Sequence, residues 1–284
     1  MRFGMNLLLW TTRVGPEHRP ILSGLAEMGY DLVEVPVFDH ADPQAYARLG
    51  EEIRALGLAP LAVSALNEGQ NVASSDREVR RAGVAALRGM IDCAAAMGAP
   101  SLSGPLHSAI GAFTGQPPTG DERAWSVEAV AEAAAHGRAN GVRLAIEPLN
   151  RFECHLLNDV ASAADYVAAI GSDAGILYDT FHAHIEEKDP GAAIRAHAGA
   201  ITLVHISEND RSTPGLGQVR WRETFDALAQ AGYDGPLVVE AFGLALPDLA
   251  AATRIWRRMF EDELGLARDA LAFMRAQVAA ARSR

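Results

Sequence analysis

The chain alternates short apolar runs with longer segments of helical spacing, and this alternation constrains its fold more than any other feature. Eight apolar runs occur, at residues 2–10, 31–37, 60–66, 99–104, 142–149, 174–180, 200–207 and 236–242. Segments with helical spacing follow them, at residues 18–28, 43–56, 76–97, 121–140, 157–170, 188–198 and 221–231, with a last stretch over roughly 247–282. Strand–helix alternation of this kind predicts βαβ units and a parallel sheet.

Eight such repeats predict an α/β fold of one closed (β/α)₈ TIM barrel with a C-terminal helical extension. The 284 residues suit this architecture as one domain over residues 1–284, because α/β barrels of this size are common. A doubly wound sheet is the alternative. That fold would more often carry a glycine-rich phosphate loop after an early strand, and neither GxGxxG nor GxxxxGK[ST] occurs in such a position.

Composition excludes some classes of partner. The net charge is −11, from 25 basic and 36 acidic residues, and no basic stripe is evident, which argues against a nucleic-acid partner. We expect no membrane partner, because no stretch of about 18 uncharged apolar residues occurs. The two scattered cysteines, Cys93 and Cys154, suit a reducing compartment and therefore a cytoplasmic protein. The short apolar N-terminal run reads as a strand and not as a signal peptide.

Four polar residues stand at the ends of four successive apolar runs. They are Glu147, Asp179, His205 and Glu240. In a parallel barrel the carboxyl ends of the strands share one rim, where functional residues gather. A salt bridge or a hydrogen bond would explain any one of them. Three carboxylates together would repel one another and take up protons, which a divalent cation prevents. Oxygen ligands with one imidazole suit Mn²⁺, Co²⁺ or Mg²⁺.

Two of these residues are candidates for a second role. Glu147 and Glu240 belong to the fifth and eighth strands, well apart around the ring, so their carboxylates could flank a substrate held on the metal. Such a pair can remove a proton from one face of a carbon and return it on the other. The metal would polarise a neighbouring carbonyl group. The pattern therefore predicts proton abstraction next to a carbonyl, without a nucleotide cofactor.

Further polar residues follow the same strands. Glu153, His182 and Arg211 are expected in loops where they could bind substrate hydroxyl groups, although each could also be an ordinary surface residue. His107 lies at the correct end of the barrel to line the pocket. Two other histidines are expected on helix surfaces, namely His184 and His197.

The chain resembles the ketose 3-epimerases, a group of xylose-isomerase-like barrels that act on D-tagatose, D-allulose or L-ribulose. The resemblance rests on AIEPLNRFECHLLND (145–159), LYDTFHAHIEEKD (177–189), VHISENDRSTPGLGQVRW (204–221) and VVEAFG (238–243), and extends to GMNLLLWT and GPLHSAIG. It implies a homodimer or homotetramer and one divalent metal ion per subunit, usually Mn²⁺ or Co²⁺. In the C-terminal stretch, Trp256, Met259 and Phe260 could pack on the barrel or on a partner, and packing on the barrel is the simpler expectation.

The resemblance also implies residue roles. Glu147, Asp179, His205 and Glu240 match the metal ligands, and Glu147 and Glu240 match the acid/base pair at C3 of the sugar. Glu153, His182 and Arg211 match the residues that bind the O1–O2 end of the ketose, which passes through a cis-enediolate. Candidates for contacting the far end of the sugar, by position only, are Trp10, Glu34, Ser64, Asn67 and Phe113. The preferred ketose stays open.

Other functions of the same barrel remain as alternatives. Hydroxypyruvate isomerases and aldose–ketose isomerases move a proton between C1 and C2, whereas an epimerase returns it to C3. Inosose dehydratases share the barrel, and a DNA-repair endonuclease would require more histidines and a basic face. A non-catalytic sugar-binding protein predicts a damaged ligand set, whereas all four candidate ligands are present here.

Overall fold

The computed structural model describes residues 1–171 and 173–283, and in them eight parallel strands close into a barrel in sequence order. The strands are β1 (Arg2–Asn6), β2 (Leu32–Pro36), β3 (Ala59–Val63), β4 (Ser101–Gly104), β5 (Arg143–Ile146), β6 (Ala174–Asp179), β7 (Ile201–Ile206) and β8 (Pro236–Val239). β1 pairs with both β2 and β8, which closes the ring. The predicted fold class, a (β/α)₈ TIM barrel, is confirmed.

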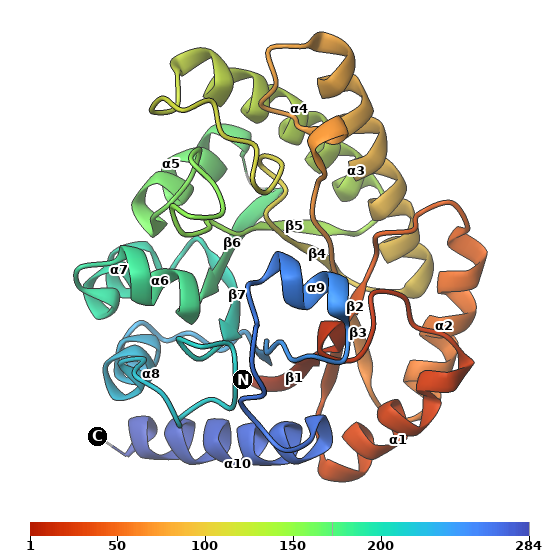
Figure 1. The fold of residues 1–284 in the computed structure, drawn as a ribbon, viewed down its shortest axis with the longest axis vertical. Helices are drawn as coiled ribbons and strands as arrows, with labels where there is room; N and C mark the ends of the chain where they lie inside the picture. Colours follow the sequence, from red (N-terminus) through yellow and green to blue (C-terminus); the bar gives the residue numbers. More distant parts are fainter. Residues whose placement is uncertain (172, 284) are drawn as a thin grey trace.

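Helices surround this barrel, as Figure 1 shows. They are α1 (Arg19–Met28), α2 (Pro43–Ala55), α3 (Arg77–Met97), α4 (Gly120–Ala139), α5 (Val160–Ile170), α6 (Thr180–Glu186), α7 (Pro190–His197), α8 (Trp221–Gln230), α9 (Pro247–Ala252) and α10 (Glu263–Arg282). Among them, the sequence did not predict the short helix α6. It begins at Thr180 and is capped by Asp179, whose Oδ1 accepts a hydrogen bond from the backbone N–H of Phe181 at 2.6 Å.

The strands carry apolar residues on both faces because both faces are covered. Six buried side chains from the strands form a small apolar cluster of their own, namely Leu32, Leu61, Ala145, Leu177, Leu203 and Val238. A much larger apolar cluster joins the strands to the surrounding helices. Within this apolar setting, the buried polar side chains at the carboxyl ends of the strands stand out, because burying them requires specific partners.

The C-terminal extension over roughly 247–282 is helical, as expected, and the structure divides it into two helices, α9 and α10. The chain leaves α9 at residue 253 and Arg254 adopts a positive φ of 62°, which a helix does not allow. α10 then begins after Asp262, whose carboxylate caps it through the N–H of Gly265 at 2.6 Å. α10 packs against α8 and α1 on the outer wall (Figure 1).

Unlike α10, the segment around α9 does not lie on the outer wall. It lies over the carboxyl ends of the strands. Ala250 and Ile255 pack with Leu8 and Phe242, which follow β1 and β8. Met259 packs against the same cluster and Phe260 against the main core, as expected. Trp256 does not, because 70% of its side chain is exposed. No described helix is long and apolar enough to cross a membrane.

Close packing of α2 on α3 provides a test of this fold. A Cβ atom added at Gly50 would lie 2.1 Å from the backbone oxygen of Met97, so one helix must move. We expect Gly50→Ala to lower the free energy of unfolding by about 1–3 kcal/mol, measured by urea denaturation. Gly120→Ala is the matched control, because no atom lies within 4 Å of its added Cβ. Equal stability of the two variants would contradict the packing.

Candidate metal centre and active site

Four buried side chains meet at the carboxyl ends of neighbouring strands. Glu147 and Glu240 directly follow β5 and β8, Asp179 ends β6, and His205 is the fifth residue of β7. All four are buried, and one potential ligand atom from each lies within 4.8 Å of the others. The structure therefore brings together the four residues that the sequence singled out as metal ligands.

His205 is oriented by a carboxylate beneath it. Its Nε2 lies 2.8 Å from Oε2 of Glu34, a fully buried residue of β2. The same carboxylate accepts hydrogen bonds from Asn6 Nδ2 at 2.8 Å and from Ser103 Oγ at 2.6 Å. Since an ionised carboxylate only accepts, Nε2 carries a proton and Nδ1 faces the other side. Glu34 thus supports the centre through His205.

Nδ1 of His205 tests whether the site suits a metal ion. It lies 3.4 Å from Glu240 Oε1 and 3.9 Å from Asp179 Oδ2. Among the residues that the structure describes, none gives this buried nitrogen a hydrogen-bond partner. A histidine that donates one ring N–H to a carboxylate and directs the other nitrogen at further carboxylates has the arrangement of a metal ligand. Three carboxylates and one imidazole fit a hard or borderline dication.

The charges in the cluster are unequal. Burial, then Glu240 and Asp179, raises the pKa of Glu147 well above its usual range. Burial also raises the pKa of Asp179, to about 6, against the effect of Arg211. For Glu240, His205 and Arg211 outweigh burial and lower the pKa. Glu147 is therefore the carboxylate that lacks positive charge, which a dication would supply.

Arg211 is the cation already present in the cluster. Its Nη1 donates to Asp179 Oδ2 at 2.8 Å, to Glu240 Oε2 at 2.5 Å and to Ser207 Oγ at 3.0 Å. The guanidinium lies over the ring of Phe181, 3.8 Å from its centroid. Arg211 follows β7 in a loop, as predicted, and reaches back into the cluster.

His182 lies beside Arg211, but on α6 and not in the loop that the sequence predicted. The reason is the helix cap at Asp179, which starts a helical turn directly after β6. Its Nδ1 accepts from the backbone N–H and the side-chain amide of Asn150, at 3.0 and 2.9 Å. Burial, then Arg211, lowers its pKa well below the usual range, so the ring is neutral.

Asn150 is a residue that the sequence reasoning missed. Its side-chain amide also donates to Glu153 Oε1 at 2.8 Å, which joins the half-buried Glu153 to His182. Asn150 itself is 1% exposed. Its position between Glu147 and Glu153 in the segment EPLNRFE is the one sign in the sequence that it lies near the site. The sequence does not show that its side chain contacts both Glu153 and His182.

His107 does not line the pocket. It is fully buried, its Nε2 lies 3.1 Å from the backbone oxygen of Glu147, and its Nδ1 lies 3.1 Å from Ser108 Oγ. Burial lowers its pKa to about 3, so the ring is neutral. His107 therefore supports the backbone that carries Glu147.

The remaining candidates for the far end of the sugar lie in different settings. Ser64 is buried and donates to the backbone oxygen of Val37 at 2.8 Å. Asn67 and Phe113 are exposed, and Trp10 is half-buried. None of these three has a contact to the four-residue cluster among the hydrogen bonds and ring contacts of the described residues.

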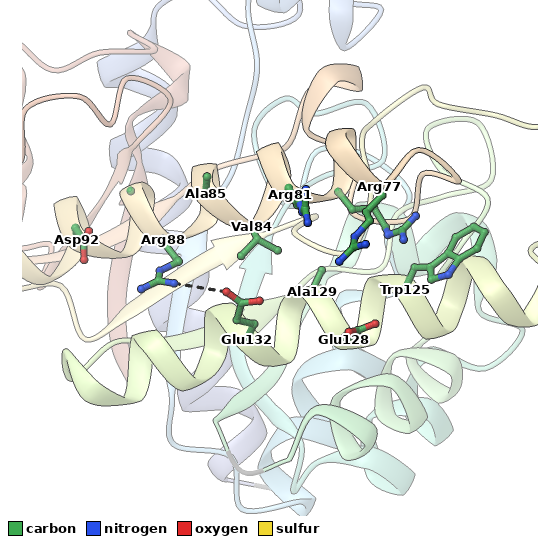
Figure 2. A pocket seen from close by; sticks show the side chains of 12 residues that line it. Arg77, Arg81, Val84, Ala85, Arg88, Asp92, Trp125, Glu128, Ala129 and Glu132 are labelled. Atoms are coloured by element: carbon green, nitrogen blue, oxygen red, sulfur yellow. Dashed lines mark hydrogen bonds and ion pairs between the residues drawn. The ribbon is translucent and has the colours of Figure 1, made fainter.

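A groove of about 760 Å³ lies elsewhere, on the outer wall between α3 and α4. Figure 2 shows its arginines along α3, facing acidic side chains and Trp125 on α4. Arg88 pairs with Glu132 at 3.5 Å, and Arg80 lies over the Trp125 ring at 4.7 Å. None of the four clustered residues lines this groove, so it is separate from the candidate metal centre.

Comparison with known proteins identifies the class to which this barrel belongs. The family model described as xylose isomerase-like TIM barrel matches residues 22–277. The chain is 35% identical to an L-ribulose 3-epimerase of Mesorhizobium japonicum, over 96% of this chain and 93% of that protein. It is 34% identical to a ketose 3-epimerase of Arthrobacter globiformis, over 99% of this chain and 98% of that protein.

Solved structures of ketose 3-epimerases also superpose closely on this chain. A structure of L-ribulose 3-epimerase superposes with a TM-score of 0.92 at 32% identity, covering 99% of this chain and 96% of that one. A D-allulose 3-epimerase from Methylomonas sp. in complex with D-allulose superposes with a TM-score of 0.91 at 27% identity, covering 98% and 97%. The chain belongs to the xylose isomerase-like TIM barrels. Within them it belongs to the ketose 3-epimerase family, whose members are isomerases.

The contact between Glu34 and His205 provides a prediction for metal binding. We expect Glu34→Gln to weaken Mn²⁺ affinity by about 10–100-fold, because the imidazole loses the partner that orients it. Titration calorimetry on metal-stripped protein measures the change. Glu122→Gln is the control, since Glu122 is a buried carboxylate that caps α4 away from the cluster. Equal affinity in both variants would show that Glu34 does not orient the ligand.

Proposed function

We propose that the chain catalyses the reversible epimerisation of a free ketose at C3, with one divalent ion held by Glu147, Asp179, His205 and Glu240. The observation that carries this proposal is the cluster itself, four buried potential ligands with an unpartnered imidazole nitrogen facing the carboxylates. The names of the relatives support the reaction type. A bound dication would polarise the C2 carbonyl group and so acidify the hydrogen on C3.

Glu147 and Glu240 are the proposed acid/base pair. They follow β5 and β8, which are separated around the barrel by β6 and β7. One carboxylate takes the proton from C3, giving an enediolate of the sugar, and the other delivers a proton to the opposite face of C3.

Glu153, His182 and Arg211 are proposed to bind the O1–O2 end of the ketose. Nη2 of Arg211 lies 2.9 Å from Nε2 of His182, within hydrogen-bond distance, so the two side chains face the same point of the site. Because Nδ1 of His182 already accepts from Asn150, the Nε2 edge of the ring and the guanidinium are the groups that would reach a sugar oxygen there. Glu153, linked to His182 through Asn150, would accept from a sugar hydroxyl group.

The metal is proposed to be Mn²⁺, with Co²⁺ or Mg²⁺ as the other candidates. Three carboxylates favour a hard cation, and the single imidazole favours a first-row transition metal over Mg²⁺. Metal analysis of protein purified without added metal, followed by reconstitution of chelator-treated protein with each ion, distinguishes these candidates.

Three coarser proposals concern the whole chain. A homodimer or homotetramer is supported by exposed apolar side chains in the loops after β5, β7 and β8, namely Phe152, Leu216 and Trp256, which are 74%, 81% and 70% exposed. One domain over residues 1–284 is supported by the pairing of β1 with β8 and by the packing of α10 on α1 and α8. A cytoplasmic location suits the two free cysteines.

The position of isotope label separates epimerisation from aldose–ketose isomerisation. We expect D-fructose, D-tagatose or L-ribulose incubated with the metal-loaded protein in D₂O to give a 3-epimer with deuterium at C3, because the proton exchanges at that carbon. NMR and mass spectrometry of the products measure it. Deuterium at C2 of an aldose product, or at C1 of the recovered ketose, would favour the isomerase alternative instead. The same panel ranks D-fructose, D-tagatose and L-ribulose as substrates.

A substitution tests the two-carboxylate mechanism. We expect Glu240→Gln to lower kcat by about 10²–10⁴-fold, because a glutamine cannot exchange the proton. The affinity for the sugar, measured by calorimetry at saturating metal, should change much less. Glu187→Gln removes another carboxylate that follows β6, away from the cluster, and should retain activity. Near-normal turnover by Glu240→Gln would eliminate this residue as acid or base.

A further inference from the structure

Glu208 is a fully buried carboxylate that no role described above explains. It lies three residues beyond His205, and its side chain accepts five hydrogen bonds. Oε1 accepts from the backbone N–H groups of Asn209, Gln218 and Val219, at 3.1, 3.1 and 3.0 Å. Oε2 accepts from the N–H of Gly215 and from Nε1 of Trp221, both at 2.8 Å.

No cation among the described residues balances this carboxylate. Within residues 1–171 and 173–283, no basic side chain forms an ion pair with Glu208. Buried carboxylates without a paired charge are rare, and N–H donors are the other means of stabilising them. Here the donors come from both ends of one loop, residues 209–221. Glu208 therefore holds the two ends of this loop together around a single charge.

Two glycines allow the loop to close so tightly. A Cβ atom added at Gly217 would lie 2.4 Å from Asn209 Oδ1 and 2.5 Å from Cγ of Glu208. Gly215 has a φ of +92°, and its added Cβ would lie 2.6 Å from the ring of Phe273 on α10. Phe273 also packs edge-on against Trp221, with ring centroids 5.1 Å apart. The loop is thus fixed to the outer wall as well as to Glu208.

Arg211 lies inside this loop in a conformation that costs free energy. Its φ is +61°, in the left-handed region that residues with a Cβ adopt rarely. Its backbone N–H donates to the backbone oxygen of Glu208 at 2.9 Å, and its own oxygen accepts from Phe242 N at 2.9 Å. In this backbone conformation, which is held at both ends, the guanidinium reaches Asp179 and Glu240.

We propose that Glu208 is a positioning residue, whose buried carboxylate fixes loop 209–221 so that Arg211 stands in the substrate pocket before a sugar binds. The loop is then a rigid, preorganised part of the site and not a lid that closes on the substrate. This inference rests on the proposed function for the role of Arg211 towards the sugar. The fixing of the loop rests on the contacts of Glu208 alone.

The test begins with readouts that require no turnover. Glu208→Gln leaves one oxygen acceptor and places an amide group against the remaining N–H donors, so the loop should open. We expect faster hydrogen exchange at the amides of residues 211, 215, 218 and 219, and faster modification of Arg211 by phenylglyoxal, mapped by mass spectrometry. Glu223→Gln on α8 has the same change of charge and should leave both rates unchanged. Unchanged rates in Glu208→Gln would overturn the proposal.

Kinetics then test whether Glu208 acts through Arg211. We expect Glu208→Gln to raise KM for the ketose about tenfold or more with a smaller change in kcat, because displacement of a binding group by about 1 Å can cost up to 10²-fold. In the double variant with Arg211→Ala, KM should equal that of Arg211→Ala alone. Multiplicative effects of the two substitutions would mean that Glu208 does not act through Arg211.

Two further outcomes are distinguishable. If the unaltered protein epimerises no ketose, the proposed function fails, while hydrogen exchange and phenylglyoxal modification still decide whether Glu208 fixes Arg211. If Glu208→Gln does not fold, Trp221→Phe removes one of the five donors and keeps an aromatic ring in place. It should raise the same exchange rates by a smaller factor, and an exchange pattern identical to that of the unaltered protein would contradict the proposal.

Discussion

The structure depends on one electrostatic constraint, namely that three carboxylates lie buried within a few ångströms of each other at the mouth of an apolar barrel. Glu147, Asp179 and Glu240 are all buried, and one ligand atom of each lies within 4.8 Å of the others and of His205. Without a dication, the three buried negative charges are stabilised unequally. Arg211 pairs with Asp179 and Glu240, whereas burial keeps the pKa of Glu147 high. A dication at the centre of the four residues removes this imbalance, and the unpartnered nitrogen of His205 faces the same space.

Two buried carboxylates near this centre solve the same problem in different ways. Glu34 is stabilised by His205, Asn6 and Ser103, and in return it orients a metal ligand. Glu208 is stabilised by five N–H groups, and in return it orders the loop that carries Arg211. In both cases a buried charge that would otherwise be costly organises its donors into one arrangement. The first acts on the metal side of the site and the second on the substrate side.

The sequence predicted the parts of the structure that depend on strand periodicity. All eight strands begin and end within about four residues of the predicted apolar runs. A polar residue at the end of an apolar run was enough to locate Glu147, Asp179, His205 and Glu240. Alternation along the chain fixes which residues reach the rim of a parallel barrel. The roles of these residues stay predictions, because proximity alone does not show catalysis.

What the sequence did not predict depends on contacts between distant segments or on local caps. Asn150 and His107 act through bonds to groups 32 and 40 positions away, which no local pattern reveals. Helix α6 depends on the carboxylate of Asp179, a residue already assigned to another role. The break before α10 depends on a left-handed Arg254, and the sequence offered no glycine or proline there as a signal.

The long-range character of these contacts also bears on how the site forms. His205 on β7 is held by Glu34 on β2, which is held by Asn6 on β1 and Ser103 on β4. Asn6 in turn reaches Glu240, which follows β8, at 3.3 Å. No consecutive half of the barrel contains all of these residues, so the orientation of the metal ligand requires the closed ring. Since pairing of distant parallel strands carries a large loop-closure cost, the ligand geometry can be complete only after β1 has met β8. The active site is therefore a property of barrel closure, and substitutions that loosen the β1–β8 seam should act on the site even where they touch none of its residues.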